Sequence, residues 1–442
     1  MNMGWTSRLS VPQSWSCDLY ALVMLGIFPL LGGDYLHITQ GKTLAFLVLS
    51  GGFLLGSWIE CLVRRPIGRL GLSPVGWCWL TLAFVELLAA VCSPYRPQTW
   101  LGGGRSGGLL LLWLYVLVAV VLARYAGLRS RFVYALALAT LIQNGVALLQ
   151  LVGGNPLGLY PEGLTYWDRD LSYAGAYLGT IGNLNQLSAF YCLTIPLLLG
   201  QALLERRPSR RWVLVGIAAL SLAIPVWTGM EACLVGLGVG LACSLPGLFP
   251  RPRSRLWCYG GLLLIGCLVL TGVWFWAGPV ESTWWQLHEV LHGQGQDHFG
   301  SMRLGIWRAA WSAVQERPWL GWGPDVFRQV YGAMFPTGAV IDAAHNEYLA
   351  YWLDGGFFGL LAYGMALALS LVRWMIYSRW DRRFLLPLAA TLCYSIQACF
   401  TFSTPIVSPL WWILWGLGVG LEREVRPSVG MNTKEIVSNN QI

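Results

Sequence analysis

Charged residues are scarce in this 442-residue chain, since only 11% of its residues are charged and 56% are hydrophobic. Soluble domains carry about 25% charged residues, so this composition excludes an ordinary soluble fold and predicts a membrane protein. The net charge of +8 does not indicate nucleic-acid binding, because the basic residues form short clusters between apolar runs and not one patch. We therefore expect membrane lipids as surroundings and no nucleic-acid partner.

Cysteine motifs are also lacking. No CxxC pair occurs among the eleven cysteines, and none of them falls in the longest polar loop. The sequence therefore predicts neither a zinc site nor a disulfide framework. The first apolar run has no signal-peptide layout with a cleavage site and is interpreted as the first membrane span.

Long apolar runs dominate what is present. A helix needs roughly 20 apolar residues to cross a bilayer. Runs of about that length are centred near residues 24, 51, 84, 116, 142, 194, 219, 237, 266, 358, 392 and 413. We predict an all-α polytopic membrane protein of about twelve transmembrane helices, with residues 1–442 as one integral-membrane domain. The polar tail 427–442 is expected to be disordered and cytoplasmic.

Basic residues separate between alternate loops. With the N-terminus inside, 21 of the 29 lysines and arginines lie on the inner side of the predicted spans and 8 on the outer side. Because Lys and Arg concentrate in cytoplasmic loops, we predict that both termini are cytoplasmic.

Three predicted outer segments are long: 93–107, 153–185 and 278–345. Long ordered loops on a rigid scaffold often carry function. Segment 278–345, between the ninth and tenth spans, is expected to contain short helices and holds four of the five histidines. No soluble domain and no internal repeat are evident.

An amphipathic helix is predicted from Arg303 to Val314, with Leu304, Trp307 and Trp311 at helical spacing. Such a helix could lie along the membrane surface, with Arg303 and Arg308 near phosphates. The alternative is an interfacial anchor without chemistry.

His345 is the candidate general base. Asp342 is a plausible N-cap for the tenth span, which would put His345 in the first helical turn. There the helix dipole would disfavour the imidazolium and keep the ring neutral, as a base requires. The alternative is a histidine that only forms hydrogen bonds at the membrane interface.

Several motifs occur together in one order. They are Arg303-x3-Trp307, Arg317-Pro318-Trp319-Leu320-Gly321-Trp322-Gly323, Ala344-His345-Asn346-Glu347-Tyr348-Leu349, Gly355-Gly356-x2-Gly359, and, upstream, Gly182-Asn183-Leu184-Asn185 and Arg105-x-Gly107-Gly108. In this order and spacing the chain resembles the O-antigen ligase and O-antigen polymerase family. The likeness covers most of the chain and is most specific over roughly 300–360.

The resemblance implies an activity and a site. Family members transfer a glycan from a polyprenyl (undecaprenyl) diphosphate carrier to an acceptor hydroxyl, on the outer face of the bacterial inner membrane. The acceptor is lipopolysaccharide core, a growing polysaccharide or a protein side chain. The loop histidine, here His345, would act as the base without a metal or other cofactor, and Arg303 would bind the diphosphate. Further candidates for binding the diphosphate or glycan are Arg308, Arg105, Arg169, Asn183, Asn185 and Asn346.

One departure from the family pattern concerns the span before the loop-bearing helix. The family often has a Ser-Arg pair there, whereas this chain reads Thr228-Gly229-Met230-Glu231-Ala232. Either another arginine (Arg105, Arg169 or Arg308) supplies the missing cation, or the activity has changed.

Other activities compatible with the sequence are a repeat-unit polymerase or protein O-oligosaccharyltransferase of the same family, and a polytopic transporter. Against a transporter, the two halves of the chain do not resemble each other, and paired broken helices are not evident.

Overall fold

The structure is a computed structural model that describes residues 14–32, 37–64, 71–103, 105, 107–168, 177–335 and 341–424. The α-helices are α1 (Trp15–Gly26), α2 (Ile38–Arg64), α3 (Pro74–Cys92), α4 (Arg96–Leu101), α5 (Leu109–Tyr125), α6 (Ser130–Leu151), α7 (Leu184–Leu204), α8 (Pro208–Thr228), α9 (Glu231–Ser244), α10 (Pro252–Phe275), α11 (Thr283–Leu291), α12 (Arg303–Glu316), α13 (Phe327–Met334), α14 (Glu347–Tyr377), α15 (Leu385–Gln397) and α16 (Ser408–Leu421). The strands β1 (Tyr177–Leu178) and β2 (Gly182–Asn183) form a small antiparallel pair. Short 3-10 helices are η1 (Phe28–Leu30), η2 (Leu245–Leu248), η3 (Arg382–Phe384), η4 (Ala398–Phe400) and η5 (Glu422–Glu424).

The all-α architecture is confirmed. Within the described ranges, nine helices are long and apolar enough to cross a membrane. All twelve predicted runs are helical. Two of them, α9 and α15, reach 18 residues only together with the adjoining 3-10 helices, and α1, α5 and α16 are shorter apolar helices. The count of twelve spans therefore stays a prediction. The tail 427–442 lies outside the described residues.

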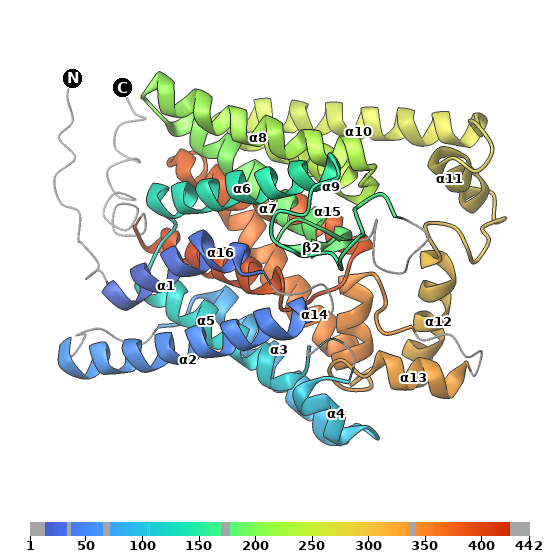
Figure 1. Cartoon of the computed structure of the whole chain (residues 1–442), viewed down its shortest axis with the longest axis horizontal. Coiled ribbons are helices and arrows are strands. Elements are labelled where there is room, and N and C mark those ends of the chain that lie inside the picture. The colour runs from blue at the N-terminus through green and yellow to red at the C-terminus, as the bar shows by residue number, and fades with distance from the viewer. Residues whose placement is uncertain are drawn as a thin grey trace, which may run out of the picture.

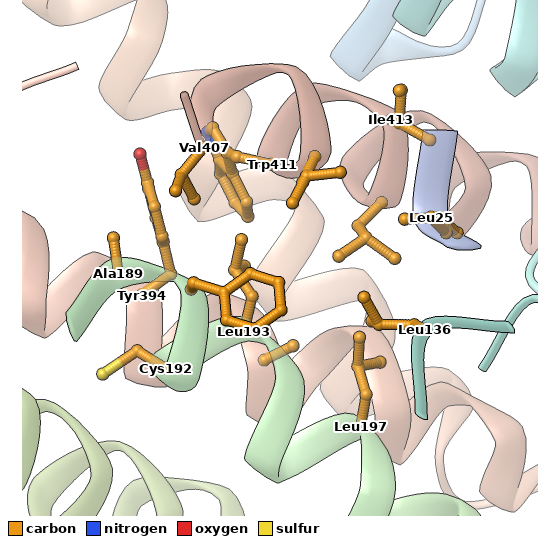
Figure 2. Close-up of a cluster of buried hydrophobic side chains, with 14 of the residues drawn as sticks. Leu25, Leu136, Ala189, Cys192, Leu193, Leu197, Tyr394, Val407, Trp411 and Ile413 are labelled. Carbon is orange, nitrogen blue, oxygen red and sulfur yellow. The ribbon is translucent and has the colours of Figure 1, made fainter. Parts of the chain in front are cut away.

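The helices form a layered bundle that runs across Figure 1, with α8 and α10 along one edge and α2 along the other. At the centre, every residue of α16 is buried, and α7 is buried along most of its length. Figure 2 shows part of this core, where Leu193 and Leu197 of α7 lie near Leu136 of α6 and Tyr394 of α15. Tyr394 also stacks on Trp411 of α16, with ring centroids 4.5 Å apart.

Small residues set the closest helix contacts. A Cβ on Gly240 of α9 would lie 2.5 Å from the Cα of Cys393 in α15. A Cβ on Gly416 of α16 would lie 2.8 Å from the carbonyl oxygen of Ala119 in α5. Lipid tails are as apolar as the helices, so spans associate through this kind of close packing and not through exclusion of water.

The three predicted outer segments meet at one end of the bundle. Ser93 donates from its hydroxyl to the carbonyl of Trp322 at 2.5 Å, and Arg303 donates to Asn185 at 3.0 Å. The loop between α10 and α14 contains α11, α12 and α13, which lie together at the right of Figure 1. Which end of the bundle faces the cytoplasm stays a prediction from the arginine distribution.

Candidate active site at the loop end of the bundle

The start of α14 differs from the sequence prediction. Asn346, not Asp342, is the N-cap, and its side chain accepts a hydrogen bond from the backbone N–H of Leu349 at 3.0 Å. His345 therefore precedes the helix, with a left-handed backbone (φ 49°). The prediction that Asp342 caps the helix and that His345 lies in its first turn is wrong. Asn346, a predicted substrate-binding residue, uses its side-chain oxygen to cap the helix.

The His345 ring is held without using its Nδ1 atom. The indole N–H of Trp307 donates to the His345 carbonyl at 3.4 Å, and the ring meets Phe402 edge-on with centroids 4.8 Å apart. Nδ1 is buried and has no hydrogen-bond partner among the described residues. Buried polar atoms nearly always have a hydrogen-bond partner. A nitrogen without one therefore indicates a position for a group of a ligand, such as a substrate hydroxyl.

Burial and neighbouring cations keep this histidine neutral. Burial lowers the pKa of His345 to about 4, with further lowering from Arg303 and Arg105 and an opposite effect from Asp342. Desolvation and nearby positive charge both disfavour the imidazolium. The neutral ring that a general base requires thus follows from burial and from the two arginines.

Arg303 begins α12 and points toward the bundle. Its guanidinium donates to the carbonyls of Phe400 at 3.1 Å and Gly300 at 2.8 Å, and to the side-chain oxygen of Asn185 at 3.0 Å. These partners are all neutral oxygens. Burial lowers the pKa of Arg303, while the carboxylate of Glu231 acts in the opposite direction. Arg303 and Trp307 lie one turn apart on the same face of α12, which brings the cation and the His345 backbone to the same place.

The paired asparagines lie at the start of α7. Asn183 is the N-cap and accepts from the backbone N–H of Asn185 at 2.9 Å. The side-chain oxygen of Asn185 accepts a hydrogen bond from Arg303, and its backbone carbonyl accepts one from the side chain of Gln397 in α15 at 3.2 Å. Asn183 thus orders the turn, and Asn185 directly positions the arginine.

Arg105 reaches the site from the first outer segment. It forms a two-point ion pair with Asp342, with Nε to Oδ2 at 2.8 Å and Nη2 to Oδ1 at 3.1 Å. Its guanidinium lies 4.2 Å from the centre of the Phe402 ring that also contacts His345. Arg105 is therefore the second cation of the site.

A comparison with known protein families covers part of this site. A family model described as O-antigen ligase matches residues 186–364. Residues 186–364 belong to the O-antigen ligase family. The match runs from α7 into α14 and includes both Arg303 and His345. None of the curated proteins compared with the chain matches it.

The family whose model matches residues 186–364 implies a general activity. O-antigen ligase family proteins carry out ligase- or polymerase-like glycan transfer, between a lipid-linked glycan and an acceptor. With its long apolar helices and this family match over residues 186–364, the chain is an integral membrane protein.

The other predicted residues are placed differently. Arg308 is exposed and pairs with Asp297 and with the carbonyl of Gly295, away from Arg303. Five residues along a helix turn the side chain by about 140°, so both arginines cannot face the same point. Arg169 lies outside the described residues.

The predicted loop helix is confirmed and extends two residues further, to Glu316, but its buried face differs. Ile306, Ala310 and Ala313 pack into a small apolar cluster with α13. Trp311 stays 46% exposed and meets Trp352 edge-on.

One structural role of the family motifs could not be read from the sequence alone. Helix α14 is interrupted at Gly356, where φ is 65° and ψ is −164°. The Arg317–Gly323 turn binds this break, since Trp322 donates from its backbone to Leu353 at 2.7 Å and Phe357 donates to Pro318 at 2.7 Å. The two glycine-containing motifs thus lock the loop to the first part of α14 and hold His345 in place. The paired motifs were visible in the sequence, but their contact was not.

Proposed function

We propose that the chain transfers a glycan from a polyprenyl diphosphate carrier to an acceptor hydroxyl, with Arg303 binding the diphosphate and His345 acting as the general base. One observation carries this proposal. A buried histidine nitrogen without a partner lies in the field of Arg303, a cation whose direct partners among the described residues are neutral oxygens. Arginine suits phosphate oxygens because its planar fork donates two parallel hydrogen bonds and stays charged.

The reaction requires little from the protein beyond positioning and charge. The acceptor oxygen forms a bond to the anomeric carbon while the bond from that carbon to the diphosphate breaks. The acceptor proton passes to His345, and the electron pair of the broken bond leaves with the diphosphate. Cations stabilise the developing charge on the leaving group, and a base near the acceptor removes the proton.

Donor binding would also activate the base. In the free protein, Arg303 and Arg105 help to hold the pKa of His345 near 4. A diphosphate bound to Arg303 offsets the charge of that cation, and so raises the basicity of the imidazole. His345 then becomes an effective proton acceptor only when the donor is present.

The acceptor decides between a ligase and a polymerase. Cells that lack the protein are expected to accumulate polyprenyl-linked glycan. Long lipid-linked chains would identify a ligase of lipid core or protein, and single repeat units would identify a polymerase. An unchanged pool of lipid-linked glycan would contradict the proposed function.

The site itself is tested with two variants. Arg303→Met and His345→Gln are each expected to reduce transfer by about 10²–10⁴-fold, the range typical of lost transition-state or acid–base contacts. The matched control is Arg328→Met, because Arg328 is an exposed arginine on α13 in the same loop. Full transfer by either site variant, at equal membrane levels, would overturn the assignment of these residues.

A further inference from the structure

A cavity of about 90 Å³ lies next to His345, on the side of Arg105 and Asp342. Ala344, which directly precedes His345, lines this cavity, and so does Phe402, whose ring contacts both His345 and Arg105. A water molecule needs roughly 10–15 Å³ of such a cavity. The cavity therefore has room for about six to nine water-sized groups, which is comparable to part of a sugar ring.

Carboxyl groups dominate the polar lining of the cavity, and most of them have partners. Glu347 accepts from the hydroxyls of Tyr363 at 3.0 Å and Tyr394 at 2.9 Å. Asp342 is paired with Arg105, and Asp354 accepts from the backbone N–H of Asp325. Each of these three carboxyl groups therefore has a hydrogen-bond or ion-pair partner within the protein.

Glu86 is the exception. Its side chain is 1% exposed and lines the cavity, and neither carboxyl oxygen has a hydrogen-bond partner among the described residues. A buried polar group without a partner is costly, and an acid within a membrane span usually faces a cavity or a ligand. Glu86 therefore indicates a missing hydrogen-bond donor.

The packing around Glu86 shows that the space is built for this carboxyl. A Cβ on Gly355 would overlap Oε1 of Glu86, and one on Gly359 would lie 3.1 Å from the same atom. These two glycines of α14 are the ones that leave room for the acid of α3. The family-like Gly355-Gly356-x2-Gly359 motif thus serves both the helix break and the carboxyl.

The lining selects the chemistry of the ligand. Carboxyl oxygens accept hydrogen bonds from hydroxyl or ammonium groups, whereas phosphate oxygens are bound by cations such as arginine. Tyr115, Tyr351 and Phe327 add aromatic surface to the same cavity. A glycan offers both hydroxyl donors and apolar ring faces, whereas a diphosphate fits the Arg303 side of His345.

We propose that this cavity binds the acceptor glycan through hydrogen bonds from its hydroxyl or amino groups to Glu86. The inference rests on the proposed function, and it separates the two substrates. The donor diphosphate lies on the cationic side of His345, and the acceptor sugar lies on the acidic side.

The test measures glycan transfer by the full-length protein in nanodiscs. Both substrates are prepared from cells that lack the protein, since such cells accumulate the lipid-linked donor and retain unmodified acceptor. The donor fraction is titrated at saturating acceptor, and the acceptor-containing envelope fraction is titrated at saturating donor.

Glu86→Met keeps the length of the side chain but removes its hydrogen-bonding oxygens. We expect the half-saturating amount of acceptor to rise about tenfold, the factor for losing one hydrogen bond of about 1.4 kcal/mol, with the donor requirement unchanged. The matched control, Glu316→Met, makes the same exchange at an exposed position of α12 and is expected to leave both requirements unchanged.

A second variant keeps the proposal testable if Glu86→Met does not fold. Ala350 also lines the cavity, so Ala350→Leu fills part of it and is expected to raise the acceptor requirement, whereas Ala350→Ser is not. The acceptor assignment would be overturned if Glu86→Met or Ala350→Leu changed the half-saturating amount of donor. It would also be overturned if either variant folded and left the half-saturating amounts of both substrates unchanged. Absence of transfer by the unmodified protein would instead overturn the proposed function.

Discussion

At the residue scale, His345 combines an unusual backbone with an unusual environment. Its φ of 49° lies in the left-handed region that non-glycine residues seldom adopt, and Trp307 holds its carbonyl. Such strain is typical of functional positions, where the surrounding structure fixes the side chain. Burial of the ring, reinforced by Arg303 and Arg105, keeps the imidazole neutral.

The pH dependence of transfer follows from this environment. The pKa of His345 is lowered to about 4, so the free protein keeps a neutral base above that pH and protonates it below. We expect kcat/KM for the donor, which reports the free protein, to fall only as the pH approaches 4. A loss centred near 6.5, the pKa of an unperturbed histidine, would contradict the proposed burial of the base.

Charges around Arg303 should control donor affinity in opposite directions. Asn185→Asp places a carboxylate against the guanidinium, which competes with the diphosphate, so the donor KM is expected to rise about tenfold. Glu231→Gln removes a negative charge that acts on Arg303 and would repel the diphosphate, so the donor KM is expected to fall. Steady-state kinetics check both changes, and shifts of the same sign would contradict the charge argument.

At the element scale, the break in α14 is the feature that organises the loop. The first part of the helix carries Glu347 and Asp354 toward the cavity, and the second part continues as a membrane span. The break exists because Gly356 adopts a conformation that other residues rarely reach, and because the Arg317–Gly323 turn supplies the hydrogen bonds that the interrupted helix lacks.

Gly356→Ala is therefore expected to destabilise the loop and α14 together. The added Cβ would overlap the backbone of Trp319 and Leu320, and the positive φ alone costs about 1–3 kcal/mol. The matched control is Gly364→Ala in the same helix, where a Cβ meets nothing within 4 Å. Thermal unfolding and protease sensitivity of the purified variants measure the difference, and equal stability of the two variants would contradict this role of the break.

At the scale of the whole molecule, residues far apart in the sequence build one end of the bundle. Arg105, Asn185, Arg303 and Phe402 come from four separate segments and converge around His345. Arg383, which belongs to the basic cluster of another loop, pairs with Glu424 at 2.6 Å. Which end of the molecule faces the cytoplasm stays a prediction.

The orientation is tested with reporter insertions. Alkaline phosphatase folds only outside the cytoplasm, so we expect it to be active when inserted after Gly293 in the long loop and inactive after Arg379. Green fluorescent protein fused after Ile442 should fluoresce in the cytoplasm. The reverse pattern would place the site on the cytoplasmic side and remove its access to the proposed substrates.

The sequence by itself determined the features that depend on local patterns. The apolar runs predict the helices because a span is recognised by its length and hydrophobicity, and the helix beginning at Arg303 follows from its periodicity. The tertiary structure alone decided which side chains meet. It brings Arg303 to Asn185 across 118 residues, turns Arg308 away and replaces Asp342 by Asn346 as the N-cap. It also leaves Glu86 in a cavity without a hydrogen-bond partner in the part of the chain that the structure describes. These outcomes depend on how helices pack and on what each charge meets there, and no local pattern contains that information.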